Sequence, residues 1–307
     1  MVRIMLKVKF LRVILKIFRK LYLSTYELIL KSEKILSSET RLTRIIESTK
    51  YNMHEESNEQ FYLEEYFLQL EKFLPNEYNS QIIKVLDLGC GQGRFISGIL
   101  NLFPNAKITG IDLSPEVIKE NKVKFNLVKG VEFIEGNFSV HLDSLADNHF
   151  DVIILTEVAF FYPEWKFDFP KILLKLKTGG QLIFSTRSSY FNALSQIAQG
   201  NMKDAERICE TKQGHLTIED PMQFSWNSSD ELINFFRHHS MKIDHVSGIG
   251  VCSGIPGDPL ARIVIPSNLY IHDRKILSKI ENKFATLIPD AGRYLLFIAT
   301  KEESIKL

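Results

Sequence analysis

The sequence contains 307 residues, of which 45% are hydrophobic and 24% are charged, a composition that fits a globular protein with one large domain. The formal net charge of +1 provides no general attraction for nucleic acid, so we expect no nucleic-acid partner. The three cysteines are odd in number and far apart, which excludes a disulfide framework and paired thiolate ligands. We therefore expect no metal site and a cytoplasmic protein.

The first 20 residues differ from the rest of the chain in charge. They carry seven bases and no acid, and the bases interrupt the apolar residues every few positions. Residues 1–20 therefore lack the apolar stretch of about 20 residues that a spanning helix needs, and they lack a signal-peptide cleavage site. Two interpretations stay open: an amphipathic helix in peripheral contact with an anionic membrane, or a helix packed on the protein body.

Residues 21–80 have helical character. In "NEQFYLEEYFLQLEKFL" the apolar residues Tyr62, Tyr66 and Leu70 recur at helical spacing, and Pro75 ends this helix. We therefore divide the chain into N-terminal helices over residues 1–80 and a second domain over residues 81–307.

From residue 81 onward, strand-like and helical segments alternate. Strands are predicted at residues 82–88, 106–111, 131–134, 150–155, 181–186, 242–246 and 293–301. Among the predicted helices, one begins at an N-cap, Ser114, and another at a capping box formed by Ser228 and Glu231. Residues 177–180, "KTGG", are predicted as a turn. The alternation indicates an α/β fold with a doubly wound sheet, in which ligands bind beyond the carboxyl ends of the strands.

The segment "KVLDLGCGQGRF", residues 84–95, places Gly89, Gly91 and Gly93 directly after an apolar strand. A strand that turns at once into a helix through glycines lets a ligand lie against bare backbone. The dinucleotide fingerprint G-x-G-x-x-G does not fit, because Arg94 or Ile96 stands where its third glycine should be. The phosphate-binding pattern G-x-x-x-x-G-K-[S/T] is absent as well.

This stretch resembles motif I of the class I S-adenosylmethionine-dependent methyltransferases, in which a short apolar run containing an aspartate precedes Gly-x-Gly-x-Gly. Four further segments resemble later motifs of that family in the same order: "GIDLSPE", "VEFIEGNF", "FDVIILTEV" and "LLKLKTGGQLIFST". The resemblance covers roughly residues 81–187. It implies a Rossmann-like sheet of seven strands in the order 3-2-1-4-5-7-6, with the seventh strand antiparallel, and S-adenosylmethionine as the cofactor.

The resemblance also implies which residues bind the cofactor. The backbone of residues 89–93 would face its methionine part, Asp87 would lie near its ammonium, and Asp112 would accept the ribose hydroxyls. Asn137 stands where the family usually has an aspartate facing adenine, and its side-chain oxygen can still accept from the adenine amine. The full set of expected cofactor-binding residues is Asp87, Gly89, Cys90, Gly91, Gly93, Asp112, Leu113, Asn137, Phe138, Thr156 and Glu157.

Methyl transfer from a sulfonium requires a nucleophile in line and the exclusion of water, and a hydroxyl nucleophile also needs a base. The candidate catalytic residues are His215, in the loop after the fifth strand, and Tyr162 and Glu157, which follow the fourth strand. A loop histidine is also commonly a surface residue, so this alternative stays open for His215.

The residues outside the motifs should select the acceptor. Aromatic side chains crowd the segment "TEVAFFYPEWKFDFP", where they line an apolar or aromatic substrate pocket, hold a cationic amine by their π-faces, or pack in the core. Two insertions, at about residues 188–227 and 250–290, are expected to form a substrate cap. We therefore expect methyl transfer to a small organic acceptor, with lipophilic or aromatic molecules as candidates. A protein or RNA methyltransferase, and a cofactor-binding partner protein without turnover, are the alternatives.

Overall fold

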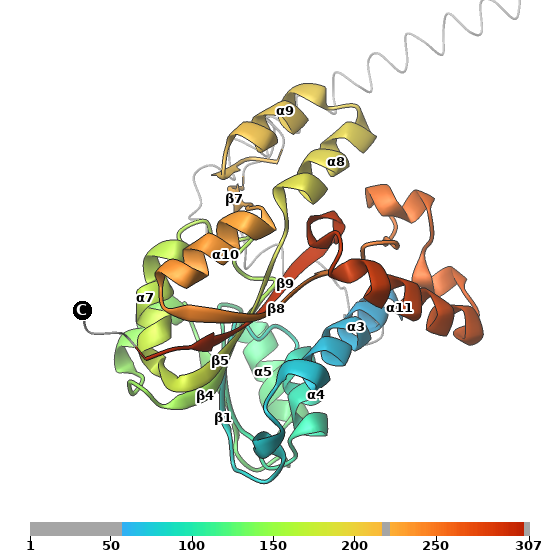
Figure 1. Ribbon diagram of the computed structural model, residues 1–307. Coiled ribbons are helices and arrows are strands. Elements are labelled where there is room, and N and C mark those ends of the chain that lie inside the picture. Colours follow the sequence, from blue (N-terminus) through green and yellow to red (C-terminus); the bar gives the residue numbers. More distant parts are fainter. Residues whose placement is uncertain (1–56, 217–221, 304–307) are drawn as a thin grey trace, which may run out of the picture.

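The computed structural model describes residues 57–216 and 222–303, so the basic segment 1–20 and both interpretations of it lie outside the described part. A seven-stranded sheet forms the centre of the molecule (Figure 1). Its strands are β1 (Lys84–Leu88), β2 (Lys107–Asp112), β3 (Val131–Glu135), β4 (Phe150–Thr156), β5 (Leu176–Thr186), β8 (Met241–Ile249) and β9 (Tyr294–Lys301).

The order of the strands is β3-β2-β1-β4-β5-β9-β8. The first five strands run parallel, and β9 is antiparallel to both of its neighbours, β5 and β8. This is the expected order 3-2-1-4-5-7-6 with an antiparallel seventh strand, so the predicted fold class is confirmed.

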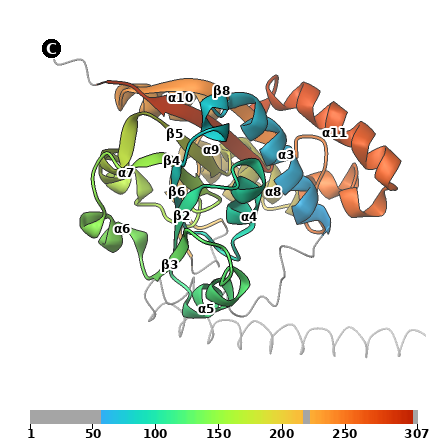
Figure 2. The ribbon, with the colours of Figure 1, turned by 90° about the horizontal axis from the view of Figure 1, so that it is seen from below.

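Helices cover both faces of the sheet (Figures 1 and 2). The helices are α3 (Ser57–Phe73), α4 (Arg94–Leu102), α5 (Pro115–Lys124), α6 (Phe138–His141), α7 (Trp165–Lys175), α8 (Ser189–Gln199), α9 (Met202–Glu210), α10 (Ser229–His238) and α11 (Ile271–Ala285). Short 3-10 turns are η1 (Asn76–Asn79), η2 (Leu142–Ser144), η3 (Pro259–Arg262), η4 (Pro266–Asn268) and η5 (Pro289–Ala291). No helix of residues 57–216 and 222–303 combines the length and apolar character that crossing a membrane requires.

Two separate apolar cores lie on the two faces of the sheet. One face packs against α3, α4, α5 and α11, and the other packs against α6, α7 and α10. In β1, Val85 belongs to the first core, whereas Leu86 and Leu88 belong to the second. The continuous apolar run of this strand is explained by this alternation, since both faces of a parallel sheet are buried.

The helix boundaries follow the local signals of the sequence. The Ser114 side chain accepts from the Val117 backbone at the start of α5, and Ser228 and Glu231 form the predicted capping box of α10. The prediction of a turn at residues 177–180 is wrong, because β5 already begins at Leu176. Leu176 pairs with Phe150 of β4, and a register shift separates this pair from the next, so the ladder tolerates the glycines.

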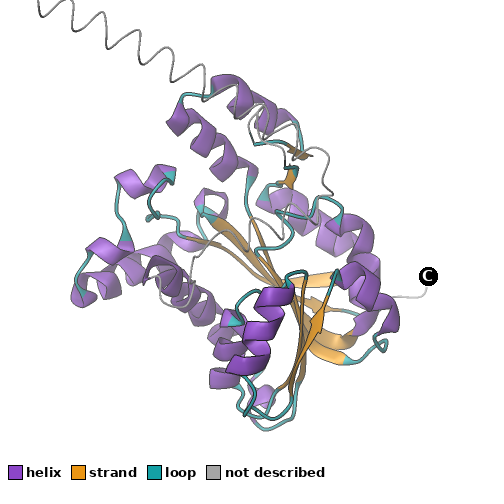
Figure 3. Ribbon diagram, turned by 180° about the vertical axis from the view of Figure 1, so that it is seen from behind, coloured by secondary structure: helices purple, strands orange, loops and turns teal. Residues whose placement is uncertain are grey.

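The first insertion folds as a small cap at the carboxyl end of β5 (Figures 1 and 3). It contains α8, α9 and the two-stranded sheet of β6 (Gln213–Gly214) and β7 (Phe224–Ser225). Its apolar cluster includes Ile208, Phe224 and Trp226, and also Phe160 from the loop after β4. The cap is therefore packed onto the end of β4, where the sequence predicts the acceptor.

Candidate active site

The glycine loop between β1 and α4 leaves open space on one side. Gly89, Gly91 and Gly93 all have positive φ, at 75°, 48° and 73°, a conformation that other residues adopt only under strain. A Cβ at Gly89 would clash with Val158, and one at Gly93 would lie 2.8 Å from the Phe125 ring. A Cβ at Gly91 would meet no atom of the described residues within 4 Å. A ligand therefore has access to the bare backbone at Gly91.

Asp112, at the end of β2, is tied to this loop. Its carboxylate accepts from the Gly91 backbone N–H at 2.8 Å and from the Ser114 backbone N–H at 3.0 Å. Burial raises the pKa of Asp112, while these backbone hydrogen bonds oppose the rise. Each oxygen keeps a further lone pair for a hydroxyl, so the ribose assignment stays a chemically sound prediction.

Asp87, in the middle of the sheet at the loop, is only 2% exposed. In the part of the chain that the structure describes, its Oδ2 atom has no hydrogen-bond partner. Burial raises the pKa of Asp87 to about 7; the nearby Asp112 charge adds to this, and Arg94 opposes it. This buried carboxylate oxygen lacks a hydrogen-bond donor, and the ammonium of S-adenosylmethionine would supply one.

The other expected cofactor residues also lie around these strand ends. The Asn137 side-chain oxygen accepts from the Ser139 backbone at 2.9 Å, which makes Asn137 the N-cap of α6. Phe138 is buried and meets the Tyr162 ring edge to face at 5.4 Å, and Leu113 is half-buried beside Asp112. Cys90 is buried, and burial raises the pKa of its thiol, so it packs rather than reacts. These binding roles stay predictions.

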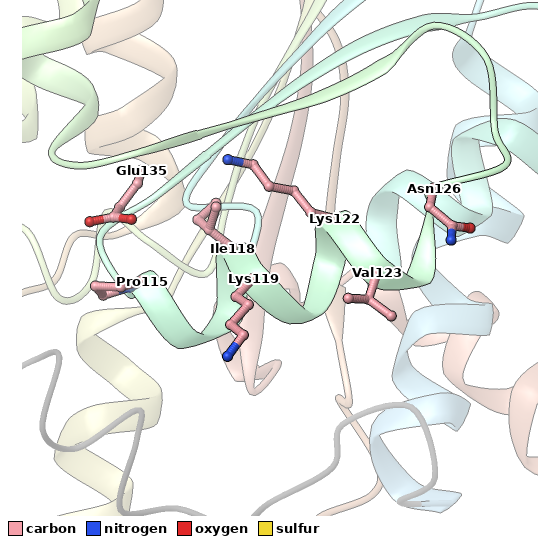
Figure 4. Close-up of a pocket in the computed structure, with 7 residues that line it drawn as sticks. All are labelled: Pro115, Ile118, Lys119, Lys122, Val123, Asn126 and Glu135. Atoms are coloured by element: carbon pink, nitrogen blue, oxygen red, sulfur yellow. The ribbon is translucent and has the colours of Figure 1, made fainter.

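A pocket of about 420 Å³ lies on the outer side of α5 (Figure 4). Its lining includes Lys119, Lys122 and Glu135, but neither Asp112 nor any glycine of the loop. This pocket lies beside the expected cofactor site and is not part of it.

The family model described as "Methyltransferase domain" matches residues 79–238, which is more than half of the chain. The chain belongs to this methyltransferase family. The predictions of a class I methyltransferase and of S-adenosylmethionine as its cofactor are thereby confirmed, while the roles of individual residues stay untested.

Named relatives match part of the methyltransferase sequence. Malonyl-[acyl-carrier protein] O-methyltransferase 2 of Ilyobacter polytropus is 27% identical over 146 residues, 47% of this chain and 53% of that protein. Fatty-acid O-methyltransferase of Mycolicibacterium smegmatis is 27% identical over 123 residues, 40% of this chain and 44% of that protein. The chain thus spans about half of the length of these relatives.

Solved structures agree in fold. A Listeria monocytogenes protein described as an S-adenosylmethionine-dependent methyltransferase aligns with a TM-score of 0.53 and 21% identity, over 80% of this chain and all of that one (100%). Burkholderia thailandensis 1,6-didemethyltoxoflavin-N1-methyltransferase, solved with S-adenosylhomocysteine, aligns with a TM-score of 0.52 and 14% identity, over 86% of this chain and 87% of that one. At these identities the likeness establishes the fold alone.

In the methyltransferase, the end of β4 carries a buried ion-pair network. Thr156 ends the strand and is buried. Glu157 follows with a positive φ of 60° and lies 2.5 Å from Arg94, which also pairs with Glu59 of α3 at 3.2 Å. No short sequence motif marks Arg94 as a member of this network. Glu59 could be found only through the fold, because it lies 35 residues before Arg94.

The three candidate catalytic residues differ in how free they are. The Tyr162 hydroxyl donates to Asp168 at 2.5 Å, and burial together with this bond raises the pKa of Tyr162. Glu157 is held by Arg94. His215 Nδ1 lies 2.8 Å from the Met222 carbonyl oxygen, so Nδ1 must donate and only Nε2 can take up a proton. Tyr162 and Glu157 are thus already bound to other side chains. In His215, which lies in the cap, Nε2 is the nitrogen that can accept a proton.

The aromatic residues after β4 divide into two groups. Trp165 and Phe169 are buried in the core between α7 and the sheet, and Phe167 is 84% exposed. Phe160 instead stacks on Phe224 of the cap, with ring centroids 4.7 Å apart, and Phe161 lies edge-on beside Phe160 at 5.0 Å. The second group, which we call the aromatic wall, joins the end of β4 to the cap; Phe160 and Phe224 are buried in it, and Phe161 is 37% exposed.

Proposed function

We propose that this protein transfers a methyl group from S-adenosylmethionine to a small lipophilic acceptor. The observation that carries the proposal is the open backbone at Gly91, which follows the strand of Asp87, whose buried Oδ2 has no hydrogen-bond partner among the described residues. The first named relative acts on a malonyl group on acyl-carrier protein and the other on a fatty acid. Their names support acceptors of the acyl type.

The bound cofactor supplies a methyl group on a positively charged sulfonium. Asp87 would hold its ammonium, Asp112 its ribose hydroxyls, and Asn137 with Phe138 its adenine. Charged hydrogen bonds of this kind contribute about 1.5–3 kcal/mol each when they are shielded from water. Because Asp112 also holds the backbone of Gly91, the ribose site and the glycine loop would be positioned together.

The two insertions would act as the acceptor cap. The first one already packs on Phe160 through the ring of Phe224, and its Ser225 backbone N–H donates to the Phe160 carbonyl at 2.9 Å. An apolar wall in this place excludes water and selects lipophilic acceptors. An RNA acceptor is disfavoured, because the formal net charge is only +1.

A pair of glycine variants tests the site. Gly91→Ala fills the open side of the loop, whereas Gly179→Ala adds a methyl group at another positive-φ glycine, also with no atom within 4 Å. Both changes strain the backbone similarly. Titration calorimetry with S-adenosylhomocysteine should show about 5- to 100-fold weaker binding for Gly91→Ala only, on the scale of an overpacked contact. Equal affinities in the two variants would contradict the proposed cofactor site.

Contact with an anionic membrane belongs to the same proposal. Residues 1–20 lie outside the described part, but α11 offers a matching surface. Ile276, Ile280 and Phe284 are spaced four residues apart and are 44%, 42% and 38% exposed. The exposed bases beside this stripe are Lys275, Lys279 and Lys283. An apolar stripe flanked by bases suits the surface of an anionic bilayer, from which a lipophilic acceptor would be taken.

A further inference from the structure

Arg187 lies at the acceptor side of the site. It directly follows β5, whose residue Ser185 pairs with Thr156 of β4. Its half-buried guanidinium lies over the ring of Phe160 at 4.8 Å and near the rings of Phe191 and Tyr294 at 5.7 and 5.8 Å. Arg187 therefore shares Phe160 with the aromatic wall of the cap.

Arg187 differs from Arg94 and Arg293 because it forms no ion pair with a described carboxylate. Arg94 pairs with Glu157 at 2.5 Å, and Arg293 pairs with Asp258. Within residues 57–216 and 222–303, no carboxylate lies within 4.0 Å of the Arg187 guanidinium, although Glu157 attracts it from a greater distance and Tyr294 interacts with it. Its Nε is buried without a hydrogen-bond partner among these residues. A cation held among rings and shielded from water binds an anion strongly when one arrives.

The state of the candidate bases points to the chemistry of that anion. Glu157 is paired with Arg94, and Tyr162 donates its proton to Asp168. An alcohol or phenol acceptor would need one of these groups, or His215 in the cap, to take its proton. A carboxylate acceptor needs no base, because it is already ionised near neutral pH.

We infer that Arg187 binds the carboxylate of the acceptor and that the protein forms a methyl ester; this rests on the proposed methyl transfer. One carboxylate oxygen donates an electron pair to the methyl carbon as the carbon–sulfur bond breaks, and that bond's electrons remain on sulfur. The products are the ester and neutral S-adenosylhomocysteine, and no proton moves. The planar guanidinium fits the second oxygen, and the apolar chain would lie along the aromatic wall, of which Phe161 is the exposed member.

The test measures binding without turnover. Titration calorimetry on the full chain with S-adenosylhomocysteine present uses two probes, dodecanoate and dodecan-1-ol, which share a chain and differ in charge. Arg187→Gln should weaken dodecanoate binding by about 10- to 100-fold and leave dodecan-1-ol unchanged, the scale of a charged hydrogen bond. Arg187→Lys should restore part of the difference. Arg237→Gln, at an exposed arginine of α10, is the matched control.

Each outcome decides the inference. A loss specific to dodecanoate supports it. An equal loss for both probes would assign Arg187 a structural role and overturn it, as would unchanged binding or a wild-type protein that binds no dodecanoate. Failure of the wild-type protein to bind S-adenosylhomocysteine would instead overturn the proposed function. At saturating S-adenosylmethionine, where the protonation of Asp87 does not limit cofactor binding, turnover of dodecanoate should also stay level from about pH 6 to 9, well above the pKa of a free carboxylate; a rise with pH would indicate a base.

Discussion

Asp87 offers the sharpest test of the cofactor site, because its charge should lower the stability of the cofactor-free protein and raise the affinity for the cofactor. The carboxylate is 2% exposed and one of its oxygens has no partner among the described residues. Replacing it in Asp87→Asn keeps the shape of the side chain and removes the charge. We expect the variant to be more stable than the wild-type protein when the cofactor is absent, and to bind S-adenosylhomocysteine less tightly.

The magnitude follows from the pKa of Asp87, which burial raises from 3.8 to about 7. Between these two values the folded protein holds a proton that the unfolded chain has lost, so the wild-type stability falls as pH rises. Above pH 7 the carboxylate is ionised in both states, and the folded protein bears the whole free-energy cost of the pKa difference. One pKa unit corresponds to about 1.4 kcal/mol, so the stability advantage of Asp87→Asn should widen by about 2–3 kcal/mol between pH 5 and pH 8.

Urea unfolding of the cofactor-free protein at pH 5 and pH 8 measures this difference. Titration calorimetry at pH 8 should show about 10- to 100-fold weaker cofactor binding in the variant, the scale of one charged hydrogen bond. Asp143→Asn, at an exposed acid whose side chain is 69% accessible, should change neither quantity. A stability gap that is the same at both pH values, or unchanged cofactor affinity, would refute the assignment of Asp87.

Three further predictions concern the ribose site, the cap and the membrane. Asp112→Ala should weaken S-adenosylhomocysteine binding by about 2–4 kcal/mol in titration calorimetry, since two charged hydrogen bonds are lost; unchanged affinity would exclude the ribose role. Removing residues 188–227 should abolish methyl transfer but spare cofactor affinity, and turnover by a folded deletion variant would show that the cap is not a substrate lid. The full chain should co-sediment with anionic liposomes at low salt more than a chain starting at residue 37; if both stay in the supernatant, the membrane contact is wrong.

The sheet was predictable because its signals are local. A buried parallel strand needs apolar residues on both faces, and a helix start needs a cap, so β1 and the start of α5 at Ser114 follow from a few adjacent residues. The segment at residues 177–180 misled the prediction, because glycines usually mark turns whereas here the ladder shifts register and continues. Such a shift depends on the partner strand and cannot be read from one segment.

The residues of the site also fall into those that a local motif predicts and those that only the fold reveals. The glycines and Asp112 stand in a compact motif, and their spacing alone brings them together at the ends of β1 and β2. The contact from Asp112 to the Gly91 backbone shows that this acid also has a structural role, which no spacing rule predicts. The role of Arg187 could not be predicted, because it depends on residues that only the fold brings together: rings from three segments, and no described carboxylate within 4.0 Å.

The N-terminal helix α3 is joined to the site by charge as well as by packing. Glu59 of α3 pairs with Arg94, which holds Glu157 at the end of β4. The Tyr66 hydroxyl of the same helix donates to Ser185 of β5 at 2.9 Å. Removing one member of a buried ion pair leaves the others uncompensated, at a cost of about 3–5 kcal/mol. A chain that begins after α3 would take Glu59 away from Arg94, the residue that pairs with Glu157, so this helix supports the end of β4 although it precedes every motif that marks the family.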